Sequence, residues 1–259
     1  MLLDIDHIAL SSSSVERDSE ILQTIGYKLD FIEIGIENLS IKRDFLKVFS
    51  KQHDISLLRS NNGFNIELIN HRNIHNIHPY LIPLFENIPS SLIEEDENTQ
   101  TDKNRIEFKM KIFGMPIYLE RNTSSKEFKF NKLVMQINNI EKTKKFFEIL
   151  GFKTINVEKG IVKLEFRSLF GNKSYFLFLN QDDNDSIRYL DGRGPNCIAF
   201  LSNSIENERK NLSEAGFYTT SIQKLILNKK LLNIFFARGP SNEIIEIISI
   251  ERNHTVHFK

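Results

Sequence analysis

Three stretches of this 259-residue chain share one layout: IDHIALSSSSVERDSEILQTIGY (residues 5–27), FNKLVMQINNIEKTKKFFEILGF (130–152) and PNCIAFLSNSIENERKNLSEAGF (195–217). Each reads as a short apolar strand, a polar break, an amphipathic helix, and a glycine followed by an aromatic residue. The third residue of each stretch precedes this glycine by 19 positions, as in the pairs His7 and Gly26, Lys132 and Gly151, and Cys197 and Gly216. Equal spacings at three places indicate an internal repeat.

The residues around each helix predict where it begins and ends. Polar residues stand at the expected N-cap positions, namely Ser13, Asn139 and Asn203. The three glycines stand where a helix ends in a left-handed residue. Strand-like segments follow, such as IVKLEFRS (161–168), in which apolar and charged side chains alternate as in a half-buried strand. Each complete unit is therefore predicted to be a βαβββ module.

A second module is expected between the first and third stretches, but its pattern is incomplete. HPYLIPLFENI (78–88) is its predicted first strand, and RIEFKMKI (105–112) and MPIYLERN (115–122) are its predicted last two strands. The polar, acidic segment SSLIEEDENTQTDKN (90–104) lies between them and indicates a solvated loop in place of a helix. The second module is thus predicted to be degenerate.

Four modules in one chain predict an α+β protein with two tandem domains. The polar stretch NTSSKEF (122–128) is the natural linker. We therefore place the first domain at residues 1–125 and the second at 126–259. A chain of this length is long enough for each domain to bury its own core.

Composition favours a protein that binds a small molecule. The 34 basic and 34 acidic residues cancel, which argues against a nucleic-acid backbone or an anionic membrane as partner. No apolar stretch approaches the roughly 20 residues that span a bilayer. The single cysteine and an N-terminus without a signal-peptide pattern favour the cytoplasm. No dinucleotide fingerprint is present, so no nucleotide cofactor is expected.

The repeated modules, with a DHIAL first strand (6–10) and an IELI last strand (66–69), resemble the vicinal oxygen chelate superfamily of glyoxalases, bleomycin-resistance proteins and ring-cleaving dioxygenases. The resemblance extends over nearly the whole chain and is weakest over residues 71–125. It implies that paired modules form a cup with a divalent metal, Fe, Mn, Ni or Zn, which polarises two neighbouring substrate oxygens. Such modules pair within one chain or between two chains, so the resemblance allows both a monomer and a homodimer.

The resemblance also implies ligand positions, residue by residue. The first-strand position falls on His7, Lys132 and Cys197 in modules one, three and four. The last-strand position falls on Glu67 in module one and Glu246 in module four, with Phe176 in module three. Dioxygenases of this length need two histidines and a carboxylate in the second domain, so dioxygenase chemistry is disfavoured. The metal is therefore expected in the first domain, on His7 and Glu67.

The remaining ligand positions allow several arrangements. A third metal ligand is expected from Tyr118, Glu120 or His78. The Lys132 ammonium is expected to pair with Glu246 and to take the place of a metal in the second domain. Cys197 is either a small buried residue or a thiol that Lys132 activates as part of a catalytic diad.

Two functional hypotheses follow. In the first, the protein is a metal-dependent enzyme with isomerase-like or lyase-like chemistry on an oxygen-rich metabolite, and His7 and Glu67 act as metal ligands or as base and acid. In the second, it binds or sequesters a metabolite or an antibiotic without a metal. Lys132, Glu246 and Arg193 would then orient the ligand between phenylalanine-rich walls.

Overall fold

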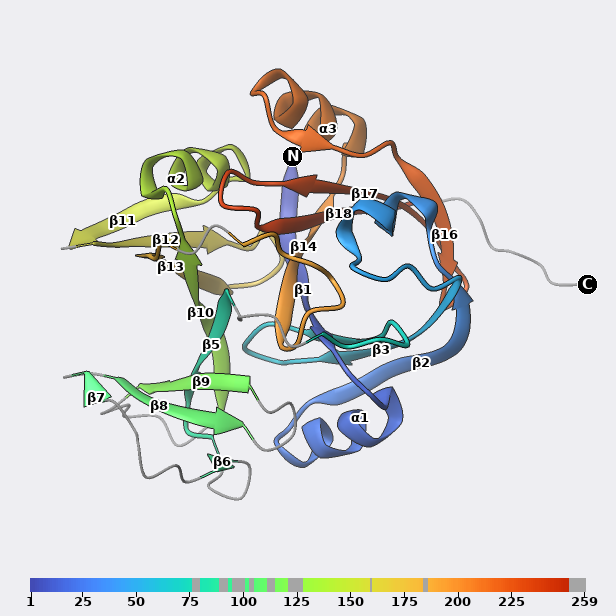
Figure 1. The fold of residues 1–259 in the computed structure, drawn as a ribbon, viewed down its shortest axis with the longest axis horizontal. Coiled ribbons are helices and arrows are strands. Elements are labelled where there is room, and N and C mark those ends of the chain that lie inside the picture. Colours follow the sequence, from blue (N-terminus) through green and yellow to red (C-terminus); the bar gives the residue numbers. More distant parts are fainter. Residues whose placement is uncertain are drawn as a thin grey trace, which may run out of the picture.

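The computed structural model describes residues 1–75, 80–88, 93–94, 101–102, 105–110, 115–120, 128–158, 160–183 and 186–251. Within these ranges the strands form two nine-stranded sheets, and three α-helices pack against them (Figure 1). None of the helices in these ranges has the length and apolar character needed to cross a membrane.

The first sheet joins the beginning of the chain to its end. Its strands are β1 (Leu2–Ser11), β2 (Lys28–Glu37), β3 (Gln52–Arg59), β4 (Ile66–Asn70), β14 (Pro195–Ser202), β15 (Tyr218–Thr219), β16 (Gln223–Leu227), β17 (Lys230–Arg238) and β18 (Ile244–Ile250). The order is β15-β17-β18-β14-β1-β4-β3-β2, and β16 pairs with β17. β1 and β14 lie antiparallel at the centre, and each runs parallel to the last strand of its own module. Module one is thus paired with module four.

The second sheet is built in the same way from modules two and three. It contains β5 (Leu81–Glu86), β6 (Ile93–Glu94), β7 (Thr101–Asp102), β8 (Arg105–Met110), β9 (Met115–Glu120), β10 (Lys129–Ile137), β11 (Lys153–Glu158), β12 (Ile161–Arg167) and β13 (Ser174–Gln181). β5 and β10 are its antiparallel central pair. Each predicted domain, 1–125 and 126–259, therefore contributes strands to both sheets. The boundary between them lies outside the described residues and stays a prediction.

The helices begin and end close to where the repeat predicts. α1 (Val15–Thr24) and α3 (Ile205–Glu214) have Ser14 and Ser204 as N-caps, one residue after the predicted positions, whereas Asn139 caps α2 (Ile140–Ile149) as predicted. The Ser14 hydroxyl accepts from the Arg17 N–H at 3.3 Å, which Ser13 does not do. All three glycines have positive φ, between 86° and 99°, as the helix-ending position requires.

Two apolar clusters lie on opposite faces of the first sheet. The larger cluster includes residues of both sheets and of the three α-helices, such as Leu68, Phe130 and Phe146. The smaller cluster lies on the concave face of the first sheet, which we call the cup. The sheet curves around the 3₁₀ helix η1 (Ser40–Phe45), whose Ile41 and Phe45 belong to this smaller cluster (Figure 1). The cup is therefore largely filled by side chains.

A close backbone contact holds the two sheets together. The Phe64 N–H donates to the Phe130 carbonyl oxygen at 2.7 Å, and the two rings meet edge to face with centroids 5.0 Å apart. A Cβ atom on Gly63 would lie only 2.4 Å from the same carbonyl oxygen. Glycine at residue 63 thus permits an approach that no other residue type would allow.

Candidate metal centre

Strand register brings three ionisable side chains from three strands together in the cup. Ala9 of β1 pairs with Glu67 of β4, and Ala199 of β14 pairs with both His7 of β1 and Glu246 of β18. Side chains two residues apart on a strand share a face of the sheet. His7, Glu67 and Glu246 therefore project from the same face at the centre of the sheet.

The three side chains form a compact and buried set of metal-ligand atoms. Their ligand atoms all lie within 4.8 Å of one another. His7 Nε2 is 3.3 Å from Glu67 Oε2 and 3.6 Å from Glu246 Oε2, and the three residues are 2%, 6% and 6% exposed. Among the described residues, Nε2 has no hydrogen-bond partner of good geometry. A buried imidazole nitrogen that faces two buried carboxylates is an arrangement suited to binding a metal ion.

Asp6 orients the imidazole of His7. The Nδ1 atom of His7 lies 2.9 Å from Asp6 Oδ2, and Asn65 Nδ2 donates to the Asp6 carbonyl oxygen at 2.6 Å. Burial alone would raise the pKa of Asp6, but the hydrogen bond and charge of His7 lower it. An ionised Asp6 accepts the Nδ1 proton and leaves Nε2 toward the carboxylates, as carboxylate partners of metal-binding histidines do.

The electrostatics of the site call for a positive charge at its centre. Burial disfavours the charged form of His7, but the neighbouring carboxylates, Glu67 foremost, outweigh burial and raise the pKa of His7 well above its usual value. Burial likewise raises the pKa of Glu67, but the charge and hydrogen bond of His7, together with the charge of Lys42, outweigh burial and lower that pKa. A divalent ion would replace the proton. One imidazole and two carboxylates suit Fe, Mn, Ni or Zn, so the residues fit such an ion.

A small cavity adjoins His7 and Glu67. Its volume is about 60 Å³, which holds a few water molecules. Apolar side chains such as Leu57, Leu232 and Ile248 make up most of its wall, with Arg59 among the polar residues. The mostly apolar wall strengthens electrostatic interactions at the centre, and the small volume restricts the part of a ligand that reaches the centre to a few atoms.

Lys132 is not where the sequence predicts it. It lies on β10 in the second sheet, and its Nζ donates to Glu86 Oε1 at 2.7 Å. The expected ion pair with Glu246 is wrong because the third module pairs with the second and not with the fourth. The Lys132–Glu86 pair occupies the second sheet at the position that corresponds to His7 in the first.

Cys197 lies in the cup but does not have the character of a nucleophile. It is completely buried on β14, in a different sheet from Lys132, so the expected diad does not form. Burial, with the carboxylates of Glu246 and Glu67, raises the pKa of the thiol well above its usual value. Activation requires the opposite shift.

Arg193, Tyr118 and Glu120 lie away from the centre. Arg193 is exposed in the turn before β14, where its backbone N–H donates to the His75 carbonyl oxygen at 3.0 Å. Tyr118 and Glu120 are on β9 in the second sheet, and His78 lies outside the described residues. The third residue of the cluster is instead Glu246. In the sequence, Glu246 stands at the same position of its module as Glu67 does. It approaches His7 only because modules one and four pair in one sheet.

Comparison with known proteins identifies the fold. No family model and no curated protein sequence matches the chain. Glyoxalase I from Zea mays matches with a TM-score of 0.61 at 14% identity, over 95% of this chain and 92% of that one. A mutant of that enzyme matches over the same shares with a TM-score of 0.65. A "putative dioxygenase" from Bacillus subtilis subsp. subtilis str. 168 matches with a TM-score of 0.61 at 13% identity, over 99% and 87%. The chain has the fold of the vicinal oxygen chelate superfamily, as its repeated modules predict.

Proposed function

We propose that this protein is a metal-dependent enzyme that binds one divalent ion on His7, Glu67 and Glu246 and acts on a small, oxygen-rich metabolite. The observation that carries the proposal is the convergence of these three buried side chains around a histidine nitrogen without a hydrogen-bond partner of good geometry among the described residues. The proposal places the site between modules one and four. The sequence alone predicted a metal site within the first domain, residues 1–125.

The donor set favours isomerase-like or lyase-like chemistry. When bound, the ion would act as a Lewis acid that stabilises negative charge on a substrate oxygen. Asp6 holds His7 in place, and the apolar cavity wall limits water around the reacting atoms. Iron-dependent oxygenases typically use two histidines and one carboxylate, whereas this centre has one histidine and two carboxylates. That difference favours proton-transfer chemistry over oxygen chemistry.

For the second sheet we propose a site without a metal. The Lys132 ammonium already pairs with Glu86 at the position equivalent to His7. An ammonium in an ion pair is protonated and cannot ligate a metal. Any ligand at this position of the second sheet would therefore bind through hydrogen bonds and apolar contacts.

Metal titration tests the proposal directly. Calorimetric titration of the purified protein with Mn²⁺, Zn²⁺, Ni²⁺ and anaerobic Fe²⁺ is expected to give one ion per chain for at least one metal. His7→Ala should abolish that binding, whereas His75→Ala, a change outside the cluster, should leave it intact. Absence of stoichiometric binding by all four metals, or full binding by His7→Ala, would refute a catalytic metal at this site.

A second assay addresses the reaction class. The metal-loaded protein is incubated in deuterated water with a panel of 2-hydroxy ketones and 2-oxo acids, and deuterium at the carbon beside the carbonyl is measured by NMR. Exchange that requires the metal and disappears in Glu246→Gln supports proton-transfer chemistry. Metal binding without exchange on any compound in the panel would separate a metal-binding role from this chemistry.

A further inference from the structure

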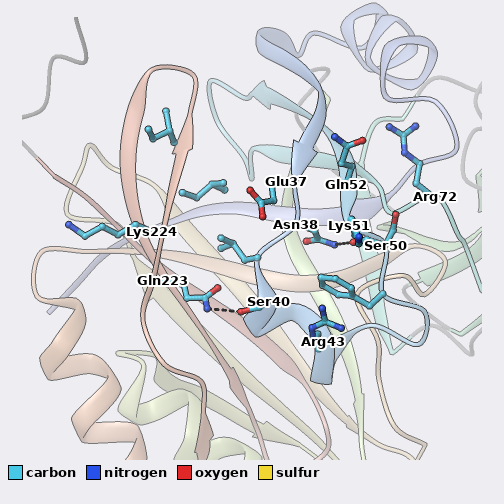
Figure 2. Close-up of a pocket in the computed structure, with 14 residues that line it drawn as sticks. Glu37, Asn38, Ser40, Arg43, Ser50, Lys51, Gln52, Arg72, Gln223 and Lys224 are labelled. Atoms are coloured by element: carbon cyan, nitrogen blue, oxygen red, sulfur yellow. Dashed lines mark hydrogen bonds between the residues drawn. The ribbon is translucent and has the colours of Figure 1, made fainter. Parts of the chain in front are cut away.

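A groove separate from the proposed metal centre opens beside η1 (Figure 2). Its volume is about 1090 Å³, and it lies between η1 with its flanking segments and strand β16. Gln52, at the start of β3, lines this groove, whereas Leu57 and Arg59, toward the end of the same strand, line the cavity beside His7. The two sites therefore lie at opposite ends of the cup.

Hydrogen bonds hold the walls of the groove in place. Gln223 Nε2 on β16 donates to the Ser40 hydroxyl at 2.7 Å (Figure 2), and the Ile41 N–H donates to Gln223 Oε1 at 3.4 Å. Asn38 Nδ2 donates to the Ser50 carbonyl oxygen at 3.1 Å and ties together the two ends of the segment that carries η1. The groove is thus a preformed feature of the fold.

Positive charge predominates along the groove. Neither Arg43 nor Lys51 forms an ion pair with a carboxylate in the part of the chain that the structure describes. Two further cations, Arg72 and Lys224, line the groove and are already paired with carboxylates at 2.6 Å. Glu37 is the acidic residue among those lining it. The charges still available to a ligand therefore favour an anion.

The groove also offers apolar surface beside these charges. The guanidinium of Arg43 lies 4.0 Å from the centroid of the Phe49 ring. Leu225 and Ile226 of β16 line the opposite wall, and Ile226 is 49% exposed. A cationic group held against an aromatic ring, in a groove that is also lined by half-buried Leu225 and exposed Ile226, fits a ligand with an acidic group and an apolar body.

Three buried polar side chains follow or precede residues that line the groove. Lys42, His53 and His71 are buried, and each is adjacent in sequence to a groove-lining residue. The two imidazoles stack with centroids 5.9 Å apart, and their four ring nitrogens have no hydrogen-bond partner among the described residues. Burial, and then the charge of Lys42, lower the pKa of both histidines, so both are neutral.

We propose that this groove binds a small organic anion, with a phosphate or carboxylate group held by Arg43 and Lys51 and an apolar body against Phe49, Leu225 and Ile226. Phosphate and carboxylate share the chemistry that these cations recognise, namely oxygen acceptors with negative charge. The site does not depend on the metal centre.

The test uses two defined probes, phenyl phosphate and benzoate, titrated calorimetrically into the full-length protein at low salt. Binding of either probe at one per chain, weakened by added salt, is expected. Phenyl phosphate alone would identify a phosphate site, and benzoate alone a carboxylate site. Replacing both cations, Arg43→Glu with Lys51→Glu, should weaken binding about tenfold or more, and Glu37→Gln should strengthen it.

Controls separate this groove from other sites. Lys210→Glu reverses an exposed charge on α3, outside the groove, and should leave probe binding unchanged. Benzyl alcohol, which lacks the charge, should not compete with either probe. The proposal would be overturned if neither probe bound at millimolar concentration, if the double charge reversal left affinity unchanged while thermal melting showed a folded protein, or if inorganic phosphate bound as tightly as phenyl phosphate.

Discussion

His7 Nε2 lies 3.6 Å from Glu246 Oε2, although the two residues come from opposite ends of the chain. The contact exists because β1 and β14 pair at the centre of one sheet and each runs beside the last strand of its own module. The candidate centre therefore belongs to the pairing of modules one and four, and its properties should depend equally on both.

The two glutamates are predicted to contribute equally to metal binding. Glu67→Gln and Glu246→Gln each remove one negative ligand oxygen, so each should weaken Mn²⁺ binding by about a hundredfold or more, equivalent to roughly 3 kcal/mol. Calorimetric titration of the two variants measures this. Glu86→Gln, which changes a carboxylate of the other sheet, serves as the matched control. Normal affinity in Glu246→Gln would confine the site to module one.

Asp6 is predicted to act on the metal only through His7. Asp6→Asn keeps the shape of the side chain but removes the charge that orients the imidazole, and the affinity for Mn²⁺ should fall by about 10- to 100-fold. Asp30→Asn removes the other carboxylate that contacts Arg59 without touching His7, so it should bind metal normally. Equal affinities in the two variants would argue against the positioning role.

Gly63→Ala is predicted to weaken the packing between the two sheets. Its new Cβ would lie 2.4 Å from the Phe130 carbonyl oxygen, and this backbone atom is held by the hydrogen bond from the Phe64 N–H. We expect a loss of about 1–3 kcal/mol in the free energy of unfolding, measured by urea denaturation. Asn61→Ala, at an exposed position in the same turn, should change stability little.

Glu243 is predicted to make stability depend on pH. Burial raises the pKa of this carboxyl from 4.5 to about 7. Between these values the folded protein binds more protons than the unfolded chain, so the free energy of unfolding falls as pH rises through this window. Glu243→Gln should remove this pH dependence. The free energy of unfolding of the variant, relative to that of wild type, should therefore rise by up to about 3 kcal/mol between about pH 5 and about pH 8. Glu20→Gln, at an exposed position on α1, is the matched control.

Cys197 is predicted to be chemically inert in the folded protein. It is fully buried, and burial with the nearby carboxylates raises the pKa of its thiol well above the usual value. Alkylation by iodoacetamide near neutral pH should therefore be far slower in native protein than in protein unfolded by urea. Rapid alkylation of the native protein would instead support an activated Cys197 thiol, the alternative that the sequence allowed.

The repeat in the sequence was sufficient to predict the modules. The 19-residue spacings place a strand, a helix and a glycine in the same order three times, because strand alternation, helix capping and positive φ are properties of short segments. The resemblance to the vicinal oxygen chelate superfamily, carried over residue by residue, gave His7 and Glu67 as the expected metal ligands. The helix starts differ from prediction by a single residue at Ser14 and Ser204, because neighbouring serines and asparagines have similar capping ability.

Only the tertiary structure decided which modules share a sheet. Local patterns on β1, β10 and β14 are nearly alike, so they hold no information about whether module one pairs with module two or with module four. That choice depends on contacts between distant segments, such as the pairing of His7 with Ala199 and the close approach of Gly63 to Phe130. The pairing of module one with module four places Lys132 and Glu246 in different sheets and places Glu246 beside His7. Sequence thus determined the repeating unit and two of the three candidate ligands, and the pairing of the modules determined the third.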